Sequence, residues 1–346
     1  MTEHIRTGII GYGLSGRVFH APLLAADPDY RLDAIVTGDP SRSDDARDAH
    51  PNTDVIASPD EFFDRADDLD LVVIATSNAS HAALSHRAIE RGLAVVVDKP
   101  FAVGTAEGGE VLREAQERGT LLSVFQNRRW DGDFLTVRSL AARGELGDVF
   151  SFESRMERWR PTLRAGWKSE APVEQGGGVL YDLGPHVIDQ AIQLFGPVSS
   201  VHAEIDVRGQ GRSADDDVLL SVRHESGVRS RLLLSTVSAL PTDRFRVRGT
   251  SAAYVVGGMD PQEQQLGDGL PPTDPGYGRA PESAWGLIGA GDEQHPVETL
   301  PGDYPAFYRG LAEAIRGDGP LPVDPTDSLE VLAIIEEAHA SAEFSR

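Results

Sequence analysis

Residues 7–16 read TGIIGYGLSG, in which an apolar run leads into three glycines with the spacing G-x-G-x-x-G. The run predicts a strand over 7–11, and the residues after the glycines predict a helix over 17–26. In such a loop the first glycine permits a tight turn, the second lets a pyrophosphate approach the backbone, and the third lets helix and strand pack closely. The stretch therefore predicts a dinucleotide-binding loop formed by Gly11, Gly13, Leu14, Ser15 and Gly16.

Strands and helices alternate in the residues that follow this loop. The predicted strands are 32–37, 71–75, 93–97 and 121–125, and the predicted helices are 59–66, 81–91 and 105–118. Gly92 and Gly119 stand where a glycine commonly ends a helix. Alternation of this kind is typical of βαβ units, so residues 1–126 are predicted to form a Rossmann domain with a parallel sheet.

The pattern changes after residue 126. Strands are predicted at 149–159, 201–207, 218–223, 228–236, 244–249 and 252–256, and helices at 134–142, 182–195, 304–316 and 328–341. Residues 257–302 are rich in glycine and proline and are predicted to form a long loop. Strands in succession favour antiparallel pairing, so residues 127–346 are predicted to form an α+β domain with a large, mostly antiparallel sheet. The closing helices could pack back on the Rossmann domain, and the fold class of the chain is α/β.

Composition limits the partners and the location of the protein. A length of 346 residues suits two domains, and the absence of cysteine excludes disulfides and cysteine-ligated metals. The N-terminal residues MTEHIRTGII predict no signal peptide, and no apolar window is long enough for a membrane span. A formal charge of −23 argues against nucleic-acid binding. We expect a cytoplasmic protein that acts on a small molecule.

The lysine content singles out one position. The chain has 32 lysines and arginines, of which only Lys99 and Lys168 are lysines. Lys99 lies in the sequence Asp98-Lys99-Pro100, directly after the most apolar predicted strand. Arginine does not release its proton in a protein, whereas lysine can be tuned to do so. Lys99 is therefore a candidate to hydrogen-bond a substrate hydroxyl and assist proton transfer; a surface turn is the alternative interpretation.

The end of the second strand bears on the choice of cofactor, because an acidic residue there binds the ribose of NAD. Gly38 stands where that acid is expected, Asp39 follows it, and Arg42 lies nearby. Asp39 would suit NAD, whereas Gly38 and Arg42 would suit the 2′-phosphate of NADP. Together with Thr37 these residues predict NAD(P) binding with NADP favoured. A plain β-turn at Gly-Asp-Pro-Ser is the alternative.

Polar residues follow three further strands, and the carboxyl ends of parallel strands line the ligand crevice of such a sheet. These residues are predicted to contact the cofactor: Ala75, Thr76, Ser77, Asn78, His81, Asp98, Lys99 and Gln126. Ser77 or Asn78 could instead cap the next helix. Beyond the boundary, Asn127, Arg128 and Arg129 are candidates for binding substrate hydroxyls, with a polar clamp between the domains as the alternative.

An aspartate and a histidine lie four residues apart after the glycine run 176–178. If a helix opens at Asp182, Pro185 falls in its first turn, where its missing N–H costs little. Asp182 and His186 then share one helical face, and a carboxylate near an imidazole poises it as an acid–base group. A helix cap with a surface histidine is the alternative. Tyr181 and Trp159 are further candidate substrate contacts.

The motifs GYGLSG (11–16), DKP (98–100) and GGG with YDLGPHVIDQ (176–190) together resemble the glucose–fructose oxidoreductase/inositol dehydrogenase/MocA (Gfo/Idh/MocA) family. The stretches GRVFHAPLL (16–24) and FQNRRWDGDFLTV (125–137) are similar to its bacterial scyllo-inositol dehydrogenases. The resemblance covers nearly the whole chain. The lysine motif of the family begins with glutamate, whereas Asp98 is one methylene shorter. The shorter side chain is expected to shift the contact with the cofactor ribose, but it does not remove the lysine of the motif.

The resemblance implies a Rossmann domain joined to an open-faced sheet domain, with association through these sheets into homodimers or homotetramers. It identifies Lys99 as the catalytic lysine and Asp182 and His186 as the acid–base pair. The implied reaction is the reversible oxidation of a ring secondary alcohol of a cyclic polyol or sugar, inositol favoured, by NAD(P) and without a metal. His186 would accept the hydroxyl proton, Lys99 would hydrogen-bond the same oxygen, and Asp182 would orient the imidazole.

Two other functions stay open at this point. The first is a nicotinamide-binding regulator of the same fold, which would have no reason to keep Lys99, Asp182 and His186 together. The second is a reductase of imines or dihydrodiols, in which the residues for hydride transfer would be similar to those of an alcohol dehydrogenase. The sequence does not decide the exact substrate, the direction of the reaction or the size of the oligomer.

Overall fold

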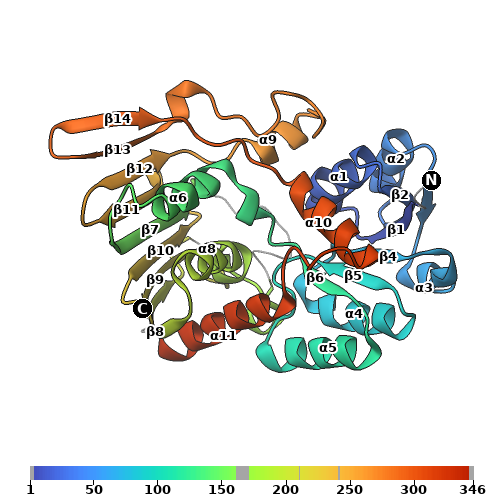
Figure 1. Cartoon of the computed structure of the whole chain (residues 1–346). Helices are drawn as coiled ribbons and strands as arrows, with labels where there is room; N and C mark the ends of the chain where they lie inside the picture. Colours follow the sequence, from blue (N-terminus) through green and yellow to red (C-terminus); the bar gives the residue numbers. More distant parts are fainter. Residues whose placement is uncertain (1–3, 161–170, 210, 241, 343–346) are drawn as a thin grey trace. The chain divides into compact units, whose positions relative to one another are not determined.

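The computed structural model describes residues 4–160, 171–209, 211–240 and 242–342, and it divides into two compact units (Figure 1). Unit 1 comprises Met1–Asn127, Gln262–Tyr277 and Tyr304–Leu329. Unit 2 comprises Arg128–Pro261, Gly278–Asp303 and Glu330–Arg346. Unit 1 therefore combines the N-terminal third of the chain with two later segments.

Unit 1 is built on a six-stranded sheet in the order β3-β2-β1-β4-β5-β6, and all neighbouring strands run parallel. The strands are β1 (Ile5–Ile10), β2 (Tyr30–Val36), β3 (Asp54–Ile56), β4 (Leu71–Ile74), β5 (Ala94–Val97) and β6 (Leu122–Val124). Their apolar runs are buried because helices cover both faces of such a sheet. The order reverses between β1 and β4, which is the point where doubly wound sheets bind ligands. The predicted Rossmann fold is confirmed.

The helices of unit 1 follow the predicted alternation, with α2 and α9 as additions. They are η1 (Ser15–His20, a π-helix), α1 (Ala21–Ala26), α2 (Pro40–Ala49), α3 (Pro59–Phe63), α4 (His81–Glu90), α5 (Thr105–Arg118), α9 (Gln262–Gly267) and α10 (Pro305–Arg316). Gly92 and Gly119 follow α4 and α5 with positive φ angles of 73° and 67°, as predicted. Helix α2 was not predicted, because its sequence is almost wholly polar and buries only Ala46.

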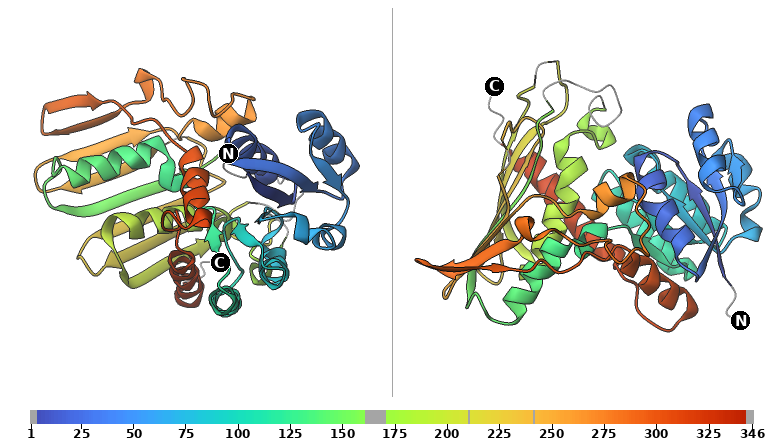
Figure 2. Two further views of the ribbon diagram at one scale, coloured as in Figure 1. Left: turned by 45° about the vertical axis from the view of Figure 1, so that its right-hand side comes forward. Right: turned by 90° about the horizontal axis from the view of Figure 1, so that it is seen from above.

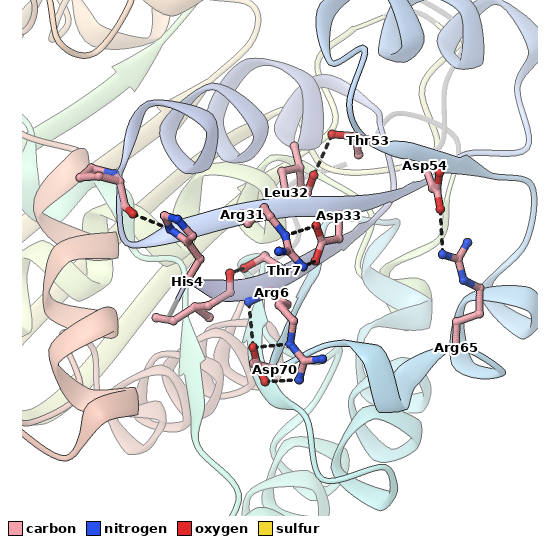
Figure 3. A network of polar contacts seen from close by, with 12 residues as sticks. His4, Arg6, Thr7, Arg31, Leu32, Asp33, Thr53, Asp54, Arg65 and Asp70 are labelled. Carbon is pink, nitrogen blue, oxygen red and sulfur yellow. Dashed lines mark hydrogen bonds and ion pairs between the residues drawn. The ribbon is translucent and has the colours of Figure 1, made fainter. Parts of the chain in front are cut away.

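The amino ends of β1 to β3 carry a polar network (Figure 3). A cavity of about 340 Å³ opens there. It is bordered by arginine–aspartate pairs: Arg6–Asp70 at 2.7 Å, Arg31–Asp33 at 2.6 Å and Arg65–Asp54 at 2.7 Å. Ligands of open parallel sheets bind at the carboxyl ends of the strands. This cavity is therefore at the wrong edge of the sheet for a dinucleotide.

Unit 2 is built on an eight-stranded sheet in the order β14-β13-β12-β11-β7-β10-β9-β8. The strands are β7 (Val149–Glu157), β8 (Val198–Asp206), β9 (Asp217–His224), β10 (Arg229–Ser235), β11 (Asp243–Gly249), β12 (Ala253–Gly257), β13 (Gly286–Ala290) and β14 (Glu293–Val297). Among the described strands only β7 and β10 pair in parallel, so the predicted mostly antiparallel sheet is confirmed.

The prediction of a long loop over 257–302 is wrong in part. This segment contains α9 of unit 1 and the hairpin of β13 and β14 in unit 2. Two glycines in β13 and Pro296 in β14 interrupt the apolar and β-branched residues from which a strand is predicted. Proline cannot donate to a ladder but is tolerated on an edge strand, and β14 is the edge of this sheet.

Helices α6 (Gly132–Ala142) and α8 (Val179–Phe195) lie on one face of this sheet, where α8 contacts β7, β9 and β10 (Figure 2). Helix α11 (Pro325–Ser341) begins in unit 1 and ends in unit 2. An oligomer formed through the opposite face of the sheet stays a prediction from the family resemblance. No helix in the described part of the chain is long and apolar enough to cross a membrane.

Candidate active site

The glycine loop connects β1 to η1 at the carboxyl edge of the parallel sheet. Gly11 has a φ of 104°, and a Cβ on it would lie 2.4 Å from the carbonyl oxygen of Ala75 at the end of β4. A Cβ on Gly16 would lie 2.0 Å from the carbonyl oxygen of Gly11. Side chains at either position would force the backbone apart. The first and third glycines thus let the loop pack close to the end of β4 and let η1 begin close to the loop, as they do in a dinucleotide-binding loop.

The residues that follow β2 lie where a dinucleotide site of this kind binds the adenosine ribose. Asp39 caps α2, and its Oδ1 accepts the N–H of Arg42 at 3.0 Å. The Gly-Asp-Pro-Ser sequence is therefore the start of a helix rather than an isolated turn. The Arg42 guanidinium lies 4.0 Å from the Cβ position of Gly13. Within the described residues no carboxylate pairs with that guanidinium.

The residues after β4 form a short 3₁₀ turn, η3 (Asn78–Ser80), before α4 begins. The alternative that Ser77 or Asn78 caps α4 is wrong, because this turn places Ser80 at the N-cap. Asn78 is buried, and the Thr76 and Ser80 hydroxyls lie 2.7 Å apart. Polar groups therefore gather at this strand end, as predicted.

His81 connects this strand end to the lysine motif. Its Nδ1 lies 2.7 Å from the carbonyl oxygen of Pro100 and its Nε2 lies 3.3 Å from that of Thr76. Burial lowers the pKa of His81, so the ring is neutral and donates one hydrogen bond. Since both neighbouring atoms are acceptors, the neutral ring can donate to only one of them. His81 thus lies between the two strand ends, and a direct cofactor contact from it stays a prediction.

The lysine motif follows β5 directly. Lys99 is half-buried, and the neighbouring Asp98 lies 3.7 Å from Nε2 of His20. Burial alone would raise the pKa of Asp98, but contacts with His20 and Ser15 and the charge of Lys99 hold this pKa at about 2. Asp98 is therefore ionised near neutral pH, beside Lys99.

His20 was not predicted to belong to the site. It is fully buried on η1, and its Nδ1 lies 2.6 Å from the hydroxyl of Tyr308 on α10. Its only sequence signal is a histidine on the inner face of the helix that follows the glycine loop. Tyr308 comes from a segment almost 300 residues away, so no local pattern could reveal their contact.

Gln126 and Asn127 follow β6 and are both buried. Among the described residues, the Gln126 Oε1 atom has no hydrogen-bond partner. An orphaned acceptor at the carboxyl edge of a Rossmann sheet suits the polar groups of a dinucleotide. Together with the glycine loop, it makes this edge of unit 1 fit NAD(P).

The predicted acid–base pair lies on α8 of unit 2. The helix begins at Val179 rather than at Asp182, so Pro185 is its seventh residue and does not lie in the first turn as predicted. The earlier start is possible because Asp215, far along the chain, accepts the amide of Leu180 at 2.8 Å. Asp182 is half-buried and His186 is 6 % exposed. The spacing of four residues on one helix keeps the two side chains on a common face.

Tyr181 and Trp159 lie in very different surroundings. Tyr181 is buried against the ring of His339, and burial, with nearby carboxylates, raises the pKa of Tyr181 to about 12. Trp159 is 55 % exposed and forms an isolated β-bridge with Val237. Their roles as substrate contacts stay predictions.

Arg128 and Arg129 are buried in unit 2 and form ion pairs. Arg129 makes two hydrogen bonds to Asp189 on α8, at 2.9 and 2.6 Å. Arg128 lies 3.3 Å from Asp131, and its carbonyl oxygen accepts a hydrogen bond from Gln190 on α8. Both arginines therefore anchor the helix that carries His186, and a direct contact with substrate stays a prediction. No cluster of three His, Asp or Glu side chains in the described ranges could hold a metal ion.

Comparison with known proteins identifies the family. A model described as an oxidoreductase family with an NAD-binding Rossmann fold matches residues 5–126, and a model of the GFO/IDH/MocA C-terminal domain matches residues 134–255. The chain belongs to the Gfo/Idh/MocA family. The predicted family is confirmed, and with it an NAD(P)-dependent dehydrogenase.

Members of the Gfo/Idh/MocA family match along the full length of the chain. The oxidoreductase YdgJ of Escherichia coli is 38 % identical over 99 % of this chain and 97 % of its own. The scyllo-inositol 2-dehydrogenase (NADP⁺) IolW of Bacillus subtilis is 34 % identical over 99 % and 95 %. The solved structure of yvaA from Bacillus subtilis, 32 % identical, covers 99 % of this chain and 96 % of its own with a TM-score of 0.91.

Proposed function

We propose that this protein catalyses the reversible oxidation of a ring secondary alcohol of a cyclic polyol, inositol-like in shape, to the ketone. The observation that carries the proposal is the position of Lys99, which follows β5 at the carboxyl edge of the Rossmann sheet and stands next to the carboxylate of Asp98. The Bacillus subtilis relative that is named for scyllo-inositol and NADP⁺ supports this substrate class.

Each protein group has a defined task in the proposed reaction. The glycine loop, the strand ends of β4 and β5 and Gln126 would hold NAD(P), which when bound supplies the hydride acceptor. His186 accepts the proton of the substrate hydroxyl, and Asp182 orients the imidazole and favours its protonated form. Lys99 donates a hydrogen bond to the same oxygen and stabilises the negative charge that develops on it.

A neutral substrate is favoured over a carboxylate. Arg128 and Arg129 are two cations that could attract an acid, but each already lies against a buried aspartate. The formal charge of −23 would also repel an anion at long range. Hydroxyl groups need only hydrogen-bond donors and acceptors, which asparagine, tyrosine and histidine supply.

A substrate panel tests this proposal. We expect reduced nicotinamide to form with scyllo- or myo-inositol, more slowly with neutral sugars, and most slowly with uronic acids. Absorbance of the reduced cofactor, with NAD⁺ and NADP⁺ in parallel, measures the rates. Uronic acids as the best substrates would overturn the neutral-ring assignment, and a flat response to every compound would favour a regulator.

Arg42→Ala is expected to weaken NADP⁺ binding at least tenfold more than NAD⁺ binding, because charge-assisted hydrogen bonds to phosphate are strong. Arg42 lies over the glycine loop, while the carboxylate of Asp39 is turned to the amide of Arg42 as a helix cap. Titration with the reduced cofactors NADPH and NADH, whose dihydronicotinamide ring fluoresces and which differ by the same 2′-phosphate, measures the two dissociation constants. Arg47→Ala, on the same helix but already paired with Asp44, is the matched control. Equal losses for both cofactors in the Arg42 variant would show that Arg42 does not bind the 2′-phosphate.

A further inference from the structure

The first turn of α8 is capped from outside the helix. Its N-cap residue is Gly178, which has no side chain to accept the free amides. Asp215 accepts two of them: its Oδ2 takes the N–H of Leu180 at 2.8 Å, and its backbone carbonyl takes that of Val179 at 2.9 Å. Asp215 therefore caps the N-terminus of the helix that carries Asp182 and His186.

The sheet of unit 2 fixes the position of Asp215. Asp215 and Asp216 precede β9 and are 6 % and 1 % exposed. The amide of Asp216 donates to the carbonyl of Asp206, the last residue of β8, at 3.0 Å. The carbonyl of Asp216 accepts the amide of Thr236, which follows β10, at 2.9 Å. Three strands thus hold the cap in place.

The glycine run before α8 makes room for this contact. Gly178 has a φ of 98°, and a Cβ on it would lie 1.8 Å from Oδ1 of Asp215. A Cβ on Gly177 would lie 1.9 Å from the carbonyl oxygen of Ala171. Gly178 is therefore required for the chain to pass close to the cap, and Gly177 is required for it to pass close to Ala171 just before the helix begins.

We propose that Asp215 is a positioning residue: it fixes the first turn of α8 and, through the helix, the orientation of Asp182 and His186 toward the substrate. This inference rests on the proposed function, since it needs those two side chains to act on the substrate. Asp182 and His186 are the fourth and eighth residues of α8, within about two turns of the cap. A tilt of the first turn would therefore move both side chains.

We expect this cap to form with a neutral hydrogen-bond acceptor as well as with a charged one. Burial raises the pKa of Asp215 to about 6, because it disfavours the charged form of the carboxyl group. The hydrogen bond to the amide of Leu180 needs an acceptor oxygen but not that charge. The amide oxygen of asparagine is isosteric with the carboxylate oxygen that caps the helix. Asp215→Asn should therefore preserve the cap, whereas Asp215→Ala removes it.

A matched control exists in the same unit. Oδ2 of Asp260, also buried, accepts the amide of Gly132 at 2.7 Å at the start of α6. Helix α6 carries none of the proposed catalytic residues. Asp260→Ala therefore removes a buried aspartate cap of the same kind from a helix that the proposal does not involve.

The expected result is a fall in kcat of about 10- to 100-fold for Asp215→Ala, because small displacements of reacting groups are costly. The KM for NAD(P) should not change, Asp215→Asn should restore most of the rate, and Asp260→Ala should keep the wild-type kcat per folded molecule. The NMR signal of the His186 ring, assigned with His186→Gln, should move in the alanine variant and stay in place in the asparagine variant. If Asp215→Ala does not fold, Asp215→Ser, with a shorter acceptor, takes its place in the comparison.

A wild-type kcat and an unmoved His186 signal in Asp215→Ala would overturn the inference, and so would an equal loss of rate in Asp260→Ala. Failure of the asparagine variant to restore the rate would also count against it. Full activity of His186→Gln would instead contradict the proposed function. If His186→Gln is inactive while Asp215→Ala is not, only the role of Asp215 is wrong.

Discussion

Lys99→Arg is expected to lower kcat by about 10²–10³, the usual cost of removing a donor that stabilises charge in the transition state. The substitution keeps a positive charge beside Asp98, so a role limited to charge would survive it. A guanidinium is wider and planar, and its proton is not available near neutral pH. If Lys99 holds the reacting oxygen, both its position and its proton exchange are lost.

Cofactor binding and folding should change little in this variant. Lys99 is a half-buried residue that follows β5 and is not part of the sheet, so we expect the sheet to form in this variant. Turnover by absorbance, cofactor binding by fluorescence and the thermal midpoint should be measured on one preparation. Wild-type turnover in the arginine variant would remove Lys99 from the mechanism.

Gly16→Ala is expected to abolish measurable NAD(P) binding and to destabilise unit 1 by about 1–3 kcal/mol, the range for overpacked sites. The new Cβ would lie 2.0 Å from the carbonyl oxygen of Gly11. Backbone atoms cannot rotate away as a side chain would, so the loop and η1 must separate. Cofactor fluorescence and thermal unfolding measure the two effects.

Gly109→Ala is the matched control, since a Cβ on Gly109 meets no atom within 4 Å. Gly109 lies inside α5, where alanine is favoured over glycine by about 1 kcal/mol. This variant should therefore be more stable than the wild type and bind NAD(P) normally. Normal cofactor binding in Gly16→Ala would show that the tight contact with Gly11 is not needed for the site.

The parallel sheet and the glycine loop were predictable because their signals are local. The run TGII, the three glycines after it and the alternation of apolar strands with helices all lie within a few residues of what they determine. The C-terminal sheet was recognised in the same way from successive apolar strands. Local patterns did not predict α2, because this helix buries only one residue, or β14, because this edge strand contains a proline.

The parts that could not be predicted depend on contacts between distant residues. Asp215 lies in the acidic run ADDD at 214–217, which as sequence is typical of a solvated surface segment. Its role depends on strands that bring it to the start of α8. The ion pairs of Arg128 with Asp131 and of Arg129 with Asp189 could not be identified from spacing either.

The central claim is that a hydride leaves a ring carbon of a cyclic polyol for the nicotinamide. The most direct test is to incubate the wild-type protein with NADP⁺ and scyllo-inositol that carries deuterium on every ring carbon, and to measure the mass of the reduced cofactor. We predict NADPH that is one mass unit heavier than the product from unlabelled inositol. Reduced cofactor of unchanged mass, or none from any labelled inositol with either NADP⁺ or NAD⁺, would contradict the account.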